Sequence, residues 1–195
     1  MTKTRFNKMH YNSPLILTFA LVSFVVLILD AFTAGASTFR FFTLLPTSLF
    51  DPMLYVRMLT CTLGHANWEH FVGNFTIILL VGPAMEERYG YKSLLKMMII
   101  TAFITGFIHF ALNMQVLGSS GIAFMLIILS SITNIKKGYI PLTLVLILFI
   151  FIGREVQFMF STDTNISHIG HIAGGICGAV LGYKVSSEKI TVEGF

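Results

Sequence analysis

A serine flanked by glycines is the first feature of this sequence that could do chemistry. Ser119 and Ser120 lie in the run Gly118-Ser119-Ser120-Gly121, where an apolar helix is expected to begin. A serine hydroxyl at a helix N-terminus, beside glycines that permit close backbone approach, suits a nucleophile next to an oxyanion hole. The same run also fits a plain turn with a serine cap, so G-x-S-G alone is a weak signal.

Two histidines in the last apolar segment offer a general base. His168 and His171 are three positions apart, and glycines follow at Gly174, Gly178 and Gly182. Glycines at four-residue intervals form a stripe along which another helix can pack closely. If this stripe faces the helix that follows the two serines, it brings His171 toward a serine hydroxyl. A neutral imidazole there can accept the hydroxyl proton.

Hydrogen-bond donors for a developing oxyanion are also present. His70 and Asn74 are four positions apart and share one face of a predicted helix. They could stabilise a tetrahedral intermediate, or they could be a hydrogen-bonded pair that links two helices. His109, in the middle of another apolar segment, fits a core histidine better than a functional one.

The composition places these residues in a membrane protein. The chain has 195 residues, of which 55% are hydrophobic and 11% charged, with a mean hydropathy of +0.80. This excludes a cytosolic enzyme, a disulfide-rich secreted scaffold and a disordered chain. Cys61 and Cys177 form neither a disulfide framework nor a metal-type pair. We therefore expect no metal and no cofactor, and we attribute the basic excess to membrane topology rather than to nucleic acid.

Uncharged runs predict six membrane helices. Residues 97–135 hold no Asp, Glu, Lys or Arg, which is nearly twice the length that a hydrocarbon core of about 30 Å requires, so two helices share this run. The expected spans are 13–29, 68–85, two within 97–135 with a break at 113–121, 139–153 and 165–183. A cleaved secretory signal is the alternative for the first span. Residues 35–64 are expected to form an ordered element in or on the membrane interface.

The charges orient these spans. Ten positive residues fall on the predicted cytoplasmic side and three on the other, which is a clear positive-inside bias. The inner ones are Lys3, Arg5, Lys8, Arg88, Lys92, Lys96, Lys136, Lys137, Lys184 and Lys189, and the outer ones are Arg40, Arg57 and Arg154. We therefore expect a short cytoplasmic N-terminus (1–12), a six-helix core (13–184) and a short cytoplasmic tail (185–195), in the plasma membrane.

Three motifs in chain order resemble those of the rhomboid family of intramembrane serine proteases. The residues that match are His65, His70 and Asn74 of H-x-x-x-x-H-x-x-x-N, Gly118, Ser120 and Gly121 of G-x-S-G, and His171, Gly174 and Gly178 of H-x-x-G-x-x-x-G. The resemblance selects Ser120 over Ser119 as the nucleophile and His171 over His168 as the base. Together, three ordered motifs are far more specific than any one of them.

Weaker similarities and departures accompany these motifs. Glu86 and Arg88 resemble the family's E-x-R-x-G turn after the second helix, and Arg57 resembles the arginine of its first long loop. The tryptophan that usually precedes this arginine is Val56 here. A tyrosine usually follows the nucleophile by four residues, and here that residue is Phe124, which can stack on an imidazole but cannot donate a hydrogen bond.

The resemblance implies an all-α integral membrane protein, a rhomboid-like bundle of six transmembrane helices, with a Ser120–His171 dyad that has no acidic third member. It also implies that His70 and Asn74 stabilise the oxyanion, that the fifth helix gates the site, and that the substrates are transmembrane proteins of the bilayer. The sequence leaves the oligomeric state open. One alternative is an inactive rhomboid-like protein that binds membrane clients. A transporter or channel with a histidine path is another, although the inverted halves of secondary carriers are not visible. A metalloprotease lacks its H-E-x-x-H motif.

Overall fold

The described part of the chain is helical. The structure, a computed structural model, describes residues 11–132, 142, 145–146, 149–150 and 168–192. Its helices are α1 (Pro14–Phe32), α2 (Ala36–Phe41), α3 (Pro52–Thr60), α4 (Trp68–Tyr89), α5 (Tyr91–Ala111), α6 (Ser120–Ile132) and α8 (His168–Val192). Between Leu44 and Val116 the backbone forms an isolated antiparallel bridge.

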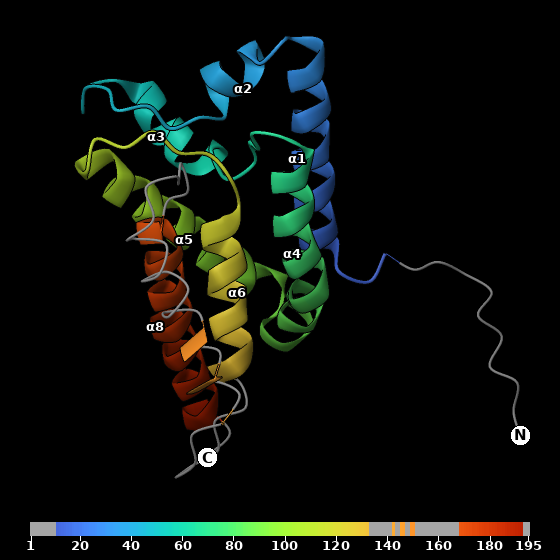
Figure 1. Ribbon diagram of the computed structural model, residues 1–195. Coiled ribbons are helices and arrows are strands. Elements are labelled where there is room, and N and C mark those ends of the chain that lie inside the picture. Colours follow the sequence, from blue (N-terminus) through green and yellow to red (C-terminus); the bar gives the residue numbers. More distant parts are fainter. Residues whose placement is uncertain (1–10, 133–141, 143–144, 147–148, 151–167, 193–195) are drawn as a thin grey trace, which may run out of the picture.

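The long helices form a bundle around α6. In Figure 1, α4, α6 and α8 run side by side, and α1 lies along α4. Helix α5 packs against both α6 and α8, while α2 and α3 lie together at one end of the bundle. Because α6 contacts α4, α5 and α8, its first residue lies where several helices meet. The all-α class expected from the sequence agrees with this architecture.

Several helix boundaries differ from the prediction. Helix α4 does not end at Met85 but continues through Glu86 and Arg88 to Tyr89, so the residues expected in a turn belong to its last helical turn. The turn itself is a single residue, Gly90, with φ of +77°, and α5 follows at once. Local hydropathy missed this because the charged residues at the ends of α4 and α5 are compatible with a helix once they lie outside the apolar core.

The remaining predicted segments agree in part. The stretch 35–64 is an ordered element, as expected, and it contains α2 and α3. Helix α8 covers His168–Val192, so it extends beyond the end of the sixth span predicted at 165–183. Most of the predicted fifth helix, 139–153, lies outside the described residues.

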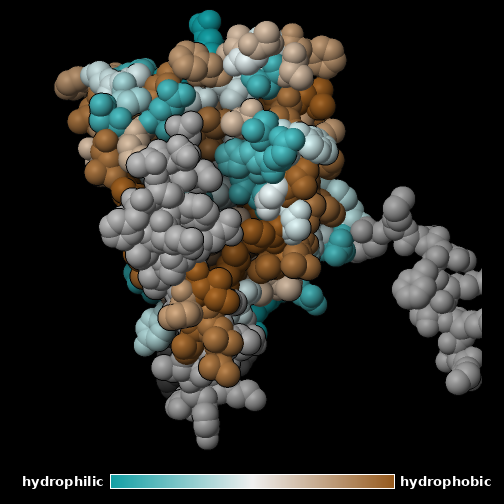
Figure 2. Space-filling model, viewed as in Figure 1, coloured by the Kyte–Doolittle hydropathy of each residue, from teal (hydrophilic) through white to brown (hydrophobic). Residues whose placement is uncertain are grey.

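Apolar character is concentrated in the long helices. Within the described residues, α1 and α5 are long and apolar enough to cross a membrane, and α6 is a shorter apolar helix. In Figure 2, brown hydrophobic residues cover much of the surface below the end that carries α2 and α3, where hydrophilic residues gather. Six spans therefore remain a prediction from the sequence.

A buried carboxylate joins the start of α1 to the end of α4. The Leu15 and Ile16 amides each donate to the Glu86 carboxylate at 3.0 Å. The first amides of a helix have no partner within it, and the helix dipole favours a negative charge there. Ser13, which occupies the N-cap position, makes no side-chain cap bond. Glu86 thus caps α1 from 70 positions away and sets the register of α1 on α4.

We expect Glu86→Ala to lower the free energy of unfolding by about 1–3 kcal/mol, because one buried and one partly buried amide lose a charged acceptor. Thermal unfolding in detergent micelles measures this loss. Glu87→Ala is the matched control, since Glu87 is the next residue and is exposed. Equal melting temperatures for the two variants would show that Glu86 does not hold α1 in place.

Candidate active site

Helices α6 and α8 touch backbone to backbone. A Cβ atom on Gly174 would lie 2.9 Å from the Gly121 Cα and closer still to the Gly121 carbonyl oxygen. One turn further along, a Cβ on Gly178 would lie 3.1 Å from the Met125 Cα and closer still to the Met125 carbonyl oxygen. Real Cβ atoms are not found so close to a backbone, so these positions accept only glycine at this helix separation. The glycine stripe of α8 therefore faces α6, which is the packing needed to bring His171 toward a serine hydroxyl.

This contact brings Ser120 of the G-x-S-G motif and His171 of the α8 motif to the same level of the bundle. Ser120 is the first residue of α6 and is partly buried, and it is the immediate neighbour of Gly121. His171 lies one turn before Gly174 in α8 and is 8% exposed. Its ring packs on Phe124, one turn along α6 from Ser120, with 4.5 Å between ring centroids. Phe124 thus contacts the imidazole as expected, but the two rings are tilted by 40° rather than stacked.

The predicted donors lie on the other side of the serine segment. A Cβ atom on Gly118 would be 2.8 Å from His70 Nε2 and 3.7 Å from Asn74 Nδ2. Gly118 also has φ of +122°, which favours glycine. Both features let α4 approach the loop two residues before Ser120. The Asn74 amide nitrogen is buried and has no hydrogen-bond partner among the described residues.

His65, in the loop between α3 and α4, contacts the serine segment through Ser119. It is fully buried, with Nδ1 3.3 Å from the Leu63 carbonyl oxygen and Nε2 3.1 Å from Ser119 Oγ. Burial, and then the nearby His70, lower the pKa of His65 to about 4. The imidazole is therefore neutral at neutral pH, and it holds the residue just before Ser120.

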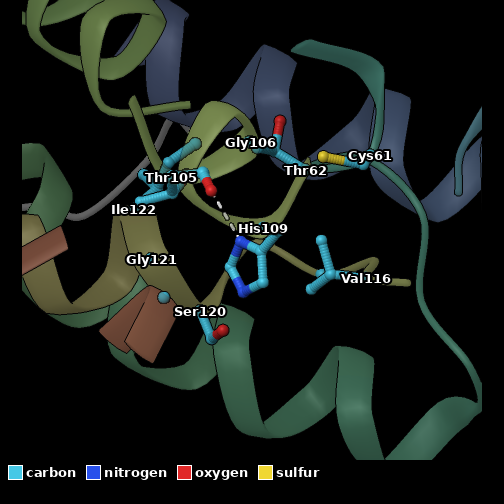
Figure 3. Close-up of a pocket in the computed structure, with 11 residues that line it drawn as sticks. Cys61, Thr62, Thr105, Gly106, His109, Val116, Ser120, Gly121 and Ile122 are labelled. Atoms are coloured by element: carbon cyan, nitrogen blue, oxygen red, sulfur yellow. Dashed lines mark hydrogen bonds between the residues drawn. The ribbon is translucent and has the colours of Figure 1, made fainter. Parts of the chain in front are cut away.

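A small cavity opens beside Ser120. It has a volume of about 20 Å³, which is room for roughly one water molecule. Figure 3 shows the His109 ring among the lining residues, with Thr105 and Ser120 nearby and Cys61, Thr62 and Val116 beyond it.

The contribution of α5 to this cavity was not predicted from the sequence. His109 is buried and hydrogen-bonded, with Nδ1 2.6 Å from the Thr105 carbonyl oxygen, as expected of a core histidine. It nevertheless lines the cavity next to Ser120. The spacing of Thr105 and His109, four residues apart on one helical face, was the available signal. Nothing local showed that this face turns toward α6.

The other predicted residues lie outside the proposed pair of Ser120 and His171. Arg57 of α3 donates from Nε at 3.0 Å and from Nη2 at 2.8 Å to the Arg40 carbonyl oxygen, which ties α3 to α2. This contact forms although Val56, which is half exposed, takes the place of the usual tryptophan. His168 is buried and its ring lies edge-on to His171, with 6.2 Å between centroids. Arg88 lies with Glu86 in the last turn of α4, away from Ser120.

The residues that the structure describes form no cluster of metal ligands. Among them, no three His, Cys, Asp or Glu side chains come together as ligands.

Comparisons with known proteins point to the same family as the sequence motifs. The family model for the Rhomboid domain matches residues 52–188. The chain is similar to "Rhomboid-like protein 11, chloroplastic" of Arabidopsis thaliana, with 25% identity over 148 residues, which are 68% of this chain and 53% of that protein. It is also similar to "Rhomboid-related protein 1" of Caenorhabditis elegans, with 29% identity over 133 residues, 62% of this chain and 37% of that protein.

The chain thus spans about half or less of the length of these two relatives. The family match covers well over half of the chain and includes α3 to α6 and most of α8, with all three motifs. Its apolar helices suit a membrane-embedded family. The chain belongs to the rhomboid family.

Proposed function

We propose that this protein is an intramembrane serine protease with Ser120 as nucleophile and His171 as general base. The observation that carries the proposal is the backbone contact of Gly121 with Gly174. This contact sets the first turn of α6 against the segment of α8 that holds His171. His171 is buried against the ring of Phe124, and a polar side chain buried in a membrane protein is costly and is a functional candidate by default.

The reaction follows from general chemistry. Ser120 Oγ attacks the carbonyl carbon of the scissile peptide bond while His171 takes its proton. The tetrahedral intermediate then collapses, and His171 returns the proton to the leaving amine. Water, activated by the same imidazole, hydrolyses the acyl-enzyme and frees the serine. No acidic residue is required, since the ring of Phe124 packs against the imidazole of His171 and helps to fix its orientation.

Stabilisation of the oxyanion falls to α4 and to the start of α6. The unpartnered Asn74 amide nitrogen and the His70 imidazole lie against Gly118, close to the nucleophile in sequence and space. Backbone amides at the N-terminus of α6 are further donors. These donors are in place before the reaction, and their hydrogen bonds become stronger as negative charge develops on the carbonyl oxygen. An oxyanion hole lowers the activation barrier in this way.

The small cavity supplies a place for the hydrolytic water. Thr105, His109 and Thr62 give its wall polar groups, and a buried water needs two to four such partners. A water molecule held there is adjacent to Ser120, where the acyl-enzyme forms.

The substrates that fit this site are transmembrane proteins. Membership of a membrane-embedded family and the apolar helices α1 and α5 support a position in the bilayer, so a substrate would reach Ser120 from within the membrane plane. Small, helix-destabilising residues in the substrate would allow its backbone to extend into the site. The plasma membrane and cytoplasmic termini belong to the same proposal and rest on the distribution of positive charge. An inactive client-binding protein, the alternative, would have no use for the dyad and its donors together.

We expect a fluorophosphonate probe to label the detergent-purified protein at Ser120 and a model membrane substrate to be cleaved. Ser120→Ala and His171→Ala should each abolish labelling, because one removes the nucleophile and the other its base. Ser131→Ala is the control, since Ser131 is a buried serine of the same helix that donates to the Ile127 carbonyl oxygen. In-gel fluorescence and mass spectrometry of the labelled peptide give the readout.

Labelling that persists in Ser120→Ala would contradict the assigned nucleophile. A folded wild-type protein that neither labels nor cleaves would favour the client-binding alternative.

We expect Asn74→Ala and His70→Ala to lower kcat by about tenfold to a thousandfold each, because each removes a donor to the oxyanion. The measurement is kcat for cleavage of the model substrate. Thr76→Ala is the control on α4, where the Thr76 hydroxyl is exposed and donates to the Val72 carbonyl oxygen. Wild-type turnover in both test variants would refute the oxyanion assignment.

A further inference from the structure

The residue before the proposed nucleophile forms a hydrogen bond with a buried histidine that lies 54 positions earlier in the sequence. Ser119 and His65 are both 0% exposed, and Ser119 Oγ lies 3.1 Å from His65 Nε2. Resting on the proposed function of Ser120, we propose that Ser119 is a positioning residue, whose hydroxyl holds the start of α6 so that the neighbouring Ser120 is aimed at the substrate.

The chemistry of His65 fixes the direction of this hydrogen bond. Its Nδ1 lies 3.3 Å from the Leu63 carbonyl oxygen, and a carbonyl oxygen can only accept. Nδ1 therefore carries the proton, so Nε2 of the neutral ring is an acceptor. The Ser119 hydroxyl must be the donor. Burial keeps the ring in this neutral form, as the lowered pKa of His65 indicates.

His65 is itself held firmly by α4. Its ring lies 5.1 Å from that of His70, 5.4 Å from that of Phe71 and 5.6 Å from that of Phe75, measured between centroids. These rings belong to the helix that carries the proposed oxyanion donors. A hydrogen bond from Ser119 to His65 therefore fixes the nucleophile segment relative to those donors.

The backbone on either side of Ser119 is also anchored. The Gly118 amide donates to the Cys61 carbonyl oxygen at 2.8 Å, and Leu44 and Val116 exchange two backbone hydrogen bonds. The Ala123 amide donates to the Ser119 carbonyl oxygen at 2.9 Å, which starts the helical hydrogen bonding of α6. Ser119 thus joins an anchored loop to the start of α6, and we infer that its side-chain hydrogen bond fixes the orientation of the helix start relative to the loop.

The test measures kcat and KM for cleavage of a model membrane substrate by wild type, Ser119→Ala and Ser119→Cys. We expect Ser119→Ala to lower kcat by about tenfold to a hundredfold, because a small misplacement of a reacting group has effects of that size. KM should stay within about twofold, since Ser119 does not reach the substrate. Ser119→Cys keeps a weak S–H donor and should have an intermediate kcat.

The control is Ser131→Ala, which removes a buried hydroxyl from the same helix without touching His65. It should keep the wild-type kcat. All variants are compared at a temperature at which circular dichroism shows them folded. If Ser119→Ala does not fold, Ser119→Cys decides the question, with a reduced kcat at unchanged KM supporting the proposal and a wild-type kcat overturning it.

A double variant separates positioning from general destabilisation. His65→Phe combined with Ser119→Ala removes both partners, and a coupled pair predicts that this double variant is no slower than the slower single variant. Effects that multiply independently, a wild-type kcat in Ser119→Ala, or an equal loss in Ser131→Ala would each overturn the positioning role. A wild-type protein without activity would instead overturn the proposed function, and this inference with it.

Discussion

The backbone contact between α6 and α8 is the constraint on which the site depends. Gly174 and Gly178 leave no room for a side chain against Gly121 and Met125. In a membrane, where lipid tails are as apolar as leucine, close packing through small residues is a main source of helix association. Here that packing also has a chemical consequence, since the helices it joins carry the proposed nucleophile and base. The rest of the bundle orients these two helices.

Helix α4 has two functions in this arrangement. Its first turns present His70 and Asn74 to the serine segment through Gly118, and its last turn holds α1 through the Glu86 carboxylate. Both contacts join residues that are far apart in the sequence. The donors, the nucleophile and the first helix are therefore parts of one packed unit rather than separate elements.

The sequence indicated the proposed site residues better than the long-range hydrogen bonds that hold their segments in place. The spacing of Gly174 and Gly178 indicated a close helix contact, and G-x-S-G placed Ser120 at a helix start, because both signals are local. The cap of α1 by Glu86 and the pairing of His65 with Ser119 were not predictable in this way. Each is a hydrogen bond between side chain and partner more than 50 positions apart, and no periodicity encodes such contacts.

The most direct test compares Gly174→Ala with Gly73→Ala in the rate of fluorophosphonate labelling at Ser120. A methyl group at Gly174 meets the Gly121 backbone, whereas one at Gly73, also within a helix, meets nothing within 4 Å. We expect Gly174→Ala to be labelled at least about a hundredfold more slowly than wild type, and Gly73→Ala to be labelled at the wild-type rate. Wild-type labelling by Gly174→Ala would contradict the claim that this contact assembles the site.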